Sequence, residues 1–318
     1  MAAESDVLVE RRQLRRKLTV WRVATFLVAL LAVLGLGLYA SRDRLSGGGL
    51  GAHVARVKIS GLITGDSQTL DLLKRVGKSS ASAVLVDIDS PGGTVSGSEI
   101  LFDALRDLSS KKPTVAVVSG LAASGGYIAA MGTDRIVAQQ TSIVGSIGVL
   151  FQSPNVSKLL ETWGISMDTI KSSPLKAAPN PLEPTTPAAQ AAMAALINDS
   201  FDWFKALVQQ RRGISGADLT TVADGRVFTG RQALPLKLID EVGTEKQAIA
   251  WLEANRNLAR DLPVRDYKPE SRTALGLWSM ASGAAGVMGY DELAAVLSAA
   301  ARGADRPALD GLLALWHP

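Results

Sequence analysis

The sequence predicts an α/β fold with a layered core, and three observations support this. Short runs rich in β-branched residues alternate with segments of helical periodicity along most of the chain. The strand-like runs are apolar at consecutive positions, which is typical of strands buried on both faces. Of the 318 residues, 47% are hydrophobic and only 20% are charged, a balance that suits a chain with a large core. We therefore expect one main domain.

The N-terminus predicts a membrane anchor. Residues 23–40 form an uninterrupted apolar run of about the length needed to span the hydrocarbon core as a helix. Basic residues concentrate in the segment 1–22, so the positive-inside rule places that segment in the cytoplasm and the main domain outside, as in a single-pass protein of the cytoplasmic (inner) membrane. A cleaved signal peptide is the alternative, with Gly35 and Gly37 forming a small-x-small site. We favour the anchor because the apolar run continues past these glycines and Leu38 spoils a site ending at residue 40.

The main domain is expected at 54–266, after a glycine-rich linker at 41–53. Its predicted strands are the apolar runs Val54–Ile59, Ala83–Ile88, Thr114–Val118, Arg135–Ala138 and Ile143–Leu150. Between and after them, helical patterns are found at Thr69–Val76, Val95–Leu108, Ser124–Met131 and Asn155–Trp163.

The second half of the sequence predicts a proline-rich loop followed by helices. The segment 174–187 contains too many prolines for a helix or a central strand, so we expect a surface loop. Proline is favoured at the first helical position, and a long helix is predicted to follow. The helices expected from here on are Pro187–Arg212, Gly230–Leu236 and Glu245–Asn255, with helical patches at Asp291–Ala301 and Leu309–Trp316 in a C-terminal helical tail, 267–318, of unknown role.

Charge and residue usage exclude several classes of function. The net charge is +4, of which residues 1–40 carry +3, six basic residues against three acidic ones, so the main domain is nearly neutral. A surface that follows nucleic-acid phosphates is therefore not expected. The chain has no cysteine, which excludes disulfides, thiol nucleophiles and thiolate metal sites. Two histidines at distant positions do not make a zinc site, and we expect neither a metal nor a cofactor.

Ser124 is the candidate nucleophile. It lies in the run LAASGGY, where small residues surround one hydroxyl at a predicted change from strand to helix. An attacking serine needs a base, which is usually histidine. The histidines are His53, near the predicted anchor, and His317, next to the last residue. A Ser-His-Asp triad is therefore not expected, and a lysine base remains.

Gly92 and Gly93, in the run DSPGGTV, are the candidate oxyanion donors. They lie between a buried strand and a helix, where backbone amides can point towards an anion. The plain alternative is a structural Pro-Gly-Gly turn. In an open α/β sheet the ends of successive strands form one edge, which would bring these glycines close to Ser124.

Lys176 is the candidate base. Its neighbours are apolar, and burial could lower the pKa of its ammonium from about 10.4 to near 8. The alternatives are that Lys176 is an ordinary solvated lysine, or that Lys171 takes this role. Ser146, in the run VGSIG, could orient the base, or could be a simple hydroxyl at the end of a strand.

These segments together resemble the signal peptide peptidase A family, membrane-bound serine peptidases of the S49 class in their single-length form. The resemblance extends from about residue 54 to 252. It is carried, in order, by DSPGGTV, LAASGGYIAA, VGSIGV, the loop around Lys176 (residues 171–177, called the lysine loop below) and ADGRVFTGRQALPLKLIDEVG. It implies a Clp-protease/crotonase-like fold, with Ser124 as nucleophile, Lys176 as general base and Ser146 bonded to that lysine. It also implies an oxyanion turn at Gly92 and Gly93. The chain departs from the family pattern at residue 177, an alanine where the family usually has aspartate.

The resemblance also implies an assembly and a substrate class. Family members of this length form homo-oligomeric rings in which one protomer's lysine serves a neighbour's serine. The expected activity is a membrane-anchored serine endopeptidase with a Ser-Lys dyad, which cleaves remnant signal peptides or other extended hydrophobic peptides outside the cytoplasmic membrane. Two alternatives stay open: a non-catalytic ring scaffold that binds membrane proteins, and a crotonase-type acyl-thioester enzyme, which would need acidic residues at the site.

Overall fold

The structure is a computed structural model, and it describes residues 21, 51–269 and 313–315. All the elements discussed below lie within residues 52–318, one of the two units into which the chain divides. The strands are β1 (His53–Ile63), β2 (Ala81–Thr94), β3 (Thr114–Ala123), β4 (Arg135–Ala138), β5 (Ile143–Gly145), β6 (Val227–Thr229), β7 (Glu241–Val242), β8 (Val264–Tyr267) and β9 (Leu313–Leu315). The helices are α2 (Ser67–Lys78), α3 (Val95–Lys111), α4 (Gly125–Met131), α5 (Ser157–Thr162), α6 (Pro187–Arg212), α7 (Gly216–Val222), α8 (Gly230–Ala233) and α9 (Glu245–Asn255).

The strands form one mixed sheet with the order β6-β5-β3-β2-β1-β8. Parallel pairing joins β8 to β1, β1 to β2, β2 to β3 and β3 to both β4 and β5. Among the described strands, antiparallel pairing joins β5 to β6 and β2 to β9. Because β1, β2 and β3 are parallel neighbours, their carboxyl ends meet at one edge of the sheet.

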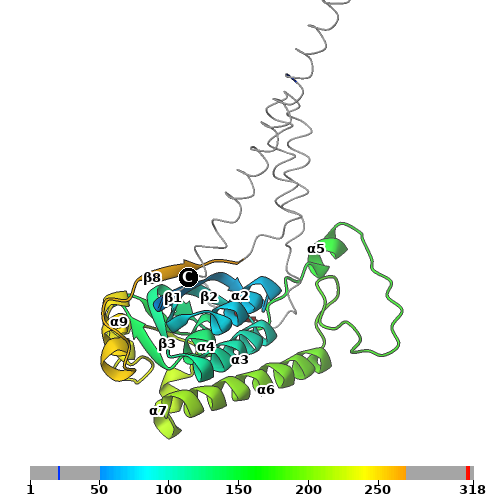
Figure 1. The fold of residues 1–318 in the computed structure, drawn as a ribbon. Coiled ribbons are helices and arrows are strands. Elements are labelled where there is room, and N and C mark those ends of the chain that lie inside the picture. The colour runs from blue at the N-terminus through cyan, green and yellow to red at the C-terminus, as the bar shows by residue number, and fades with distance from the viewer. Residues whose placement is uncertain (1–20, 22–50, 270–312, 316–318) are drawn as a thin grey trace, which may run out of the picture. The chain divides into compact units, whose positions relative to one another are not determined.

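Helices cover both faces of this sheet, which confirms the predicted layered α/β core. In Figure 1, α2, α3 and α4 lie together over one side of the strands, with α6 beyond them, and α9 lies at the other side. The side chains of β2 divide accordingly: Val84, Val86 and Ile88 belong to the cluster under α2 to α4, whereas Ala83 and Leu85 pack with α9. This alternation is the two-residue period of a strand, with apolar residues on both faces.

The long helix α6 has the boundaries that its sequence predicts. Thr186 caps its N-terminus by accepting a hydrogen bond from the Ala189 amide, and proline occupies the first helical position. Its C-terminus ends at Gly213, where φ is +66°, a left-handed conformation that glycine adopts without strain. The helix therefore connects the loop that contains Lys176 to the body of the domain.

Three sequence predictions need correction. The strand β2 continues through the Pro-Gly-Gly segment to Thr94, because β1 pairs with it as far as Gly93. The strand β5 ends at Gly145, since Ser146 has a φ of +52° that leaves the extended region. At Leu313–Leu315 the tail is a strand paired with β2, not part of the predicted helix Leu309–Trp316.

Several sequence predictions fall on residues that the structure does not describe. These are the anchor at 23–40, its basic flank before Trp21, most of the linker 41–53 and the helical patch Asp291–Ala301. Among the described residues, no helix is both long and apolar enough to cross a membrane.

Candidate active site

Ser124 lies at the point where β3 ends and α4 begins, in a conformation unusual for a residue with a side chain. Its φ is +52° and its ψ is −115°. The backbone around it is fixed: the Ser124 amide donates to the carbonyl of Gly145 at 2.8 Å, and the Ser124 carbonyl accepts from the amide of Tyr127 at 2.9 Å. Positive φ at a non-glycine residue costs free energy, and such residues cluster at functional sites.

The hydroxyl of Ser124 is buried and has no hydrogen-bond partner. The residue is 1% exposed, and its Oγ contacts no donor or acceptor of the described residues. Leaving a buried polar group unpaired costs about 1–3 kcal/mol, so native proteins pair nearly all of them. A nucleophilic serine needs a hydroxyl that is free to bond a base and to attack a substrate, and the unpaired hydroxyl of Ser124 meets this requirement.

The start of α4 lies directly against the end of β2. A Cβ on Gly126 would be 2.6 Å from the carbonyl oxygen of Ser90, so only glycine allows this approach. Ser90 is also the last residue of β2 that pairs with β3, opposite Ala122. The structure thus brings the serine turn and the Pro-Gly-Gly segment together at one edge of the sheet.

The two candidate oxyanion glycines are not equivalent. The amide of Gly92 donates to Ser90 Oγ at 3.1 Å, so it is occupied inside its own segment, which corrects the expectation of two available donors. A Cβ on Gly93 would lie 1.8 Å from the carbonyl oxygen of Ile63, so no side chain fits at this position. Of the two glycines, Gly93 is the better candidate for the oxyanion donor.

Ser146 lies beside Ser124 through the pairing of β3 with β5. Gly145 is opposite Ala123 in the register, and each serine directly follows one of these residues. Ser146 is 7% exposed, and like Ser124 it has a φ of +52°. Its amide donates to the carbonyl of Arg226 at 2.9 Å, which holds it against the segment that precedes β6. The structure therefore places both candidate serines at the same sheet edge.

Lys176 is not brought to this edge by the fold of one chain. It lies in the loop between α5 and α6, which extends away from the sheet in Figure 1. The residue is exposed, so the predicted burial of its ammonium is not found in the single chain. No described residue forms an ion pair or hydrogen bond with its side chain, and only its amide is held, by the carbonyl of Ser173 at 3.1 Å.

Lys171, the competing candidate, is already engaged. Its ammonium forms an ion pair with the carboxylate of Glu183 within the same loop. Hydrogen bonding from Lys171, supported by Thr169 and Asn180, lowers the pKa of Glu183 to about 2. A lysine committed to a carboxylate is a poor proton acceptor, so the geometry favours Lys176 over Lys171 as the base.

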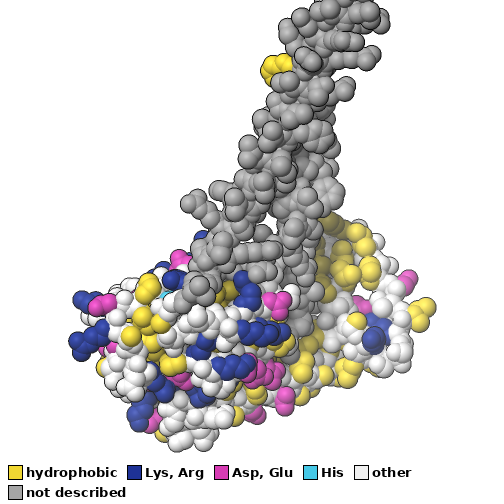
Figure 2. Space-filling view, in the orientation of Figure 1, with side chains coloured by type: hydrophobic (Ala, Val, Ile, Leu, Met, Phe, Trp, Pro, Cys, Tyr) yellow, Lys and Arg dark blue, Asp and Glu magenta, His cyan; other side chains and the backbone are white. Residues whose placement is uncertain are grey.

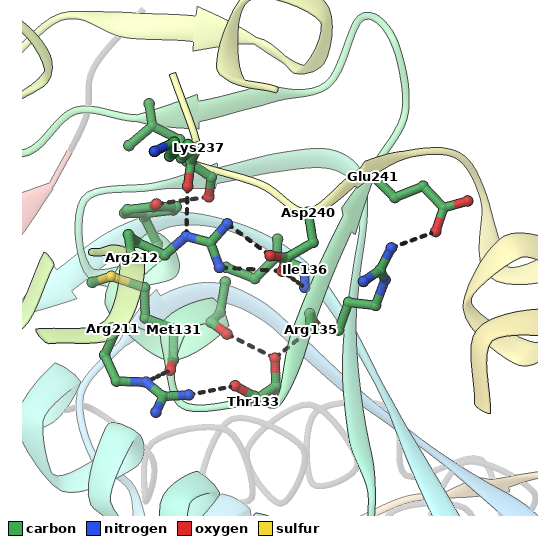
Figure 3. A network of polar contacts seen from close by, with 12 residues as sticks. Met131, Thr133, Arg135, Ile136, Arg211, Arg212, Lys237, Asp240 and Glu241 are labelled. Atoms are coloured by element: carbon green, nitrogen blue, oxygen red, sulfur yellow. Dashed lines mark hydrogen bonds and ion pairs between the residues drawn. The ribbon is translucent and has the colours of Figure 1, made fainter. Parts of the chain in front are cut away.

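Two arginines that the sequence analysis did not single out tie the end of α6 to its surroundings, and one of them holds the far end of α4, the helix that follows Ser124. Arg211, in the last turn of α6, donates to the carbonyls of Met131 and Thr133, both at 2.9 Å (Figure 3). Beside it, Arg212 donates two hydrogen bonds, of 3.0 and 3.1 Å, to the carboxylate of Asp240. Asp240 in turn accepts from the amide of Ile136 at 2.7 Å. Their only signal in the sequence was a basic pair at a predicted helix end.

Tyr127 holds α4 in place through a buried hydrogen bond. It is completely buried, and its hydroxyl donates to the carbonyl of Leu238 at 2.7 Å. Burial raises the pKa of Tyr127, so this side chain stays neutral. The helix α4 is therefore held by α6 at its far end and by the segment between α8 and β7 at Tyr127.

The comparisons with known proteins identify a family. The model of peptidase family S49 matches residues 106–259. A Synechocystis protein named "Putative protease" is 38% identical over 229 residues, which cover 70% of this chain and 83% of that protein. An Enterococcus faecium protein named "Putative signal peptide peptidase SppA" is 27% identical, over 75% of this chain and 73% of its own length. The Arabidopsis thaliana chloroplastic serine protease SPPA is 32% identical, over 70% of this chain and 34% of its own length.

Solved structures are also similar to this chain. A membrane-bound stomatin-specific protease aligns with a TM-score of 0.43 at 18% identity, over 69% of this chain and 99% of that one. This likeness is too distant to support a conclusion about function.

Proposed function

The chain belongs to peptidase family S49, and from this premise we propose that it is a serine endopeptidase whose nucleophile is Ser124 and whose base is Lys176. The fold is then the Clp-protease/crotonase-like fold of the family resemblance. The observation that carries the proposal is the buried, unpartnered Ser124 hydroxyl on a strained turn. No metal or cofactor is proposed.

The proposed reaction uses Ser124, Gly93 and Ser146 at one sheet edge, together with Lys176 from a second copy of the chain. Lys176 removes the proton from Ser124 Oγ, and the oxygen attacks the carbonyl carbon of a peptide bond. The amide of Gly93 donates to the oxyanion that develops, while Ser146 orients the lysine. The amine product leaves with the proton that Lys176 carries, and water then hydrolyses the acyl-enzyme with Lys176 again as the base.

The proposed lysine comes from a second copy of the chain, as the family resemblance implies. The segment around α5 that carries Lys176 exposes a group of apolar side chains, visible in Figure 2 over this part of the molecule. This apolar arm comprises Leu159, Trp163, Ile165, Met167, Ile170 and Leu175. Contiguous exposed apolar surface of this kind marks an interaction site, and a neighbouring protomer packed against it would also desolvate Lys176. We propose a homo-oligomeric ring on this basis.

The proposed location and substrates rest on the sequence. If residues 23–40 anchor the chain with 1–22 in the cytoplasm, the site faces outward from the cytoplasmic membrane. Remnant signal peptides and other extended hydrophobic peptides are then the accessible substrates. The name of the Enterococcus faecium relative agrees with this substrate class.

The test of the proposed function is hydrolysis of an unfolded polypeptide by the full chain in detergent. We expect Ser124→Ala to lower the rate at least about 10³-fold, because the nucleophile is lost. Its thermal stability should not fall, since the hydroxyl makes no hydrogen bond. Ser109→Ala is the control: it removes a half-buried serine hydroxyl on α3 that bonds only the carbonyl of Arg106. A folded, oligomeric wild type no faster than Ser124→Ala would support a scaffold instead.

The shared site is tested by mixing two inactive variants. Ser124→Ala and Lys176→Met are co-expressed with different tags, and mixed oligomers are isolated. If one protomer's lysine serves its neighbour's serine, about a quarter of the sites contain both intact groups, because each of the two contributors is of the required kind half of the time. We expect recovery of up to that fraction of wild-type activity. Mixed oligomers as inactive as either variant alone would contradict the shared site.

A further inference from the structure

The C-terminal strand β9 pairs with the segment that contains the candidate oxyanion glycine. Its pairing with β2 is antiparallel, with Leu315 opposite Gly92, Ala314 opposite Gly93 and Leu313 opposite Thr94. These are the last described residues of the chain, and they follow the domain core by a long stretch of sequence. The strand Leu313–Leu315 thus pairs with the part of β2 that contains the candidate oxyanion donor.

The topology fixes the side of β2 on which β9 lies. A strand has two hydrogen-bonding edges, and β1 occupies one edge of β2 as far as Gly93, opposite Ile63. The other edge belongs to β3 as far as Ser90, opposite Ala122. One residue beyond Ala123, β3 turns away at Ser124. The strand β9 therefore takes the place in the sheet that β3 leaves at the serine turn.

That place is where an extended peptide would have to lie to be attacked. A peptide paired with Gly92–Thr94 runs past both the serine turn and the Gly93 backbone, and main-chain hydrogen bonds would hold it, as in other β-strand additions. Two of the three β2 residues are glycines, so recognition there depends on the backbone. The strand Leu-Ala-Leu of β9 is itself an extended apolar peptide, the substrate class proposed above.

We infer that Leu313–Leu315 is an autoinhibitory strand, which occupies the substrate position and must be displaced before a peptide can bind. This inference rests on the proposed peptidase function and adds a regulation of the same site. A tethered segment competes at an effective concentration of the order of mM, well above that of a dilute substrate. Its pairing is only three residues long, so a longer extended peptide can displace it.

The activity test compares two truncations of the full chain in detergent. Deleting residues 312–318 removes the strand, and we expect kcat/KM for a short extended apolar peptide to rise about tenfold or more, mainly through a lower KM. Deleting only 316–318 keeps the paired segment and serves as the control. Ala314→Pro, which removes the central amide of the strand, should act like the longer deletion. Equal kcat/KM in active wild type and in both strand-disrupting variants would overturn the inference.

A binding test separates the inference from the peptidase proposal. A fluorescent peptide with the sequence of residues 308–318 is titrated into Ser124→Ala that lacks 312–318, and into Ser124→Ala with the intact tail. We expect anisotropy to show at least about tenfold tighter binding to the truncated protein, because its strand position is free. If the peptide binds the truncated protein more tightly but no variant hydrolyses peptides, the result would support the position inferred for Leu313–Leu315 and overturn the peptidase function. No binding to the truncated protein would overturn the inference that Leu313–Leu315 occupies the substrate position.

Discussion

The serine turn and the lysine loop are built in opposite ways. Ser124 is buried, its backbone is held by Gly145 and Tyr127, and the helix that follows it is anchored at its far end by Arg211. Lys176 is exposed on a loop that extends from the sheet, with one backbone hydrogen bond. The comparison teaches that the fold of one chain fixes Ser124, the proposed nucleophile, whereas it does not fix Lys176, which the proposed assembly would have to position.

The physical reason lies in the two sequences. The serine turn follows a strand of consecutive apolar residues, and Gly126 allows α4 to approach β2 closely. The lysine loop is interrupted by prolines and holds itself together by local polar contacts, such as the ion pair of Lys171 with Glu183. Its apolar side chains are exposed, and in the proposed assembly a partner surface that buries them would order the loop more firmly.

The largest expected effect is on the rate of peptide hydrolysis, which should distinguish Lys176 from Lys171. We expect Lys176→Met to lower peptide hydrolysis about 10³-fold, within the range by which a general base accelerates a reaction. Lys171→Met should lower it less than about tenfold, because this ammonium only supports the loop through Glu183. Single-turnover hydrolysis by matched oligomers measures both. A greater loss in Lys171→Met than in Lys176→Met would reverse the assignment of the base.

The next effect tests how tightly the sheet edge at the serine turn is packed. Gly93→Ala would place a methyl group 1.8 Å from the carbonyl of Ile63, so the backbone must shift. We expect a loss of about 2–4 kcal/mol in the free energy of unfolding, together with loss of activity.

Gly77→Ala is the matched control for the Gly93 substitution. Gly77 lies in α2, and an added Cβ would have its nearest contact at 3.6 Å, from the side chain of Leu108. Replacing a helical glycine with alanine stabilises by about 0.5–1 kcal/mol. Chemical denaturation of both variants provides the comparison. Equal stability of the two would show that the edge at Gly93 is not closely packed.

A smaller effect tests the attachment of α6 to the segment between α8 and β7. Arg212→Ala removes two hydrogen bonds to Asp240 and one to the carbonyl of Lys237. It also leaves the carboxylate of Asp240, whose side chain is 27% exposed, without its cation. We expect a loss of about 2–3 kcal/mol, which lowers Tm by several degrees in a domain of this size. The control Lys111→Ala breaks an exposed helical pair with Asp107 and should cost less than about 0.5 kcal/mol. A similar Tm for the two variants would mean that the network of Figure 3 contributes little.

The sequence predicted the layered α/β core and the meeting of the serine turn with the Pro-Gly-Gly segment at one sheet edge, for reasons that the structure makes clear. The catalytic roles of these residues stay predictions. Buried strands such as β3 carry their pattern in consecutive residues, and small residues around Ser124 report the close approach of two backbones. The occupied amide of Gly92 was not predictable, because it depends on where the hydroxyl of Ser90 points. The strand at Leu313–Leu315 was missed because a short apolar run has no periodicity that separates strand from helix. Its partner, β2, is more than two hundred residues away in sequence.

The smallest effect concerns the lysine loop and its dependence on pH. Because Lys171 lowers the pKa of Glu183 from 4.5 to about 2, the ionised carboxylate stabilises the folded loop above pH 4.5, and this contribution is lost as the pH falls from 4.5 through 2. Glu183→Gln should therefore increase hydrogen exchange of residues 171–183 about two- to fivefold at pH 7, the modest effect of a partly exposed pair. At pH 2 the wild type should approach the variant. A ratio of exchange rates that does not change between pH 7 and pH 2 would show that the ion pair of Lys171 with Glu183 does not order this loop.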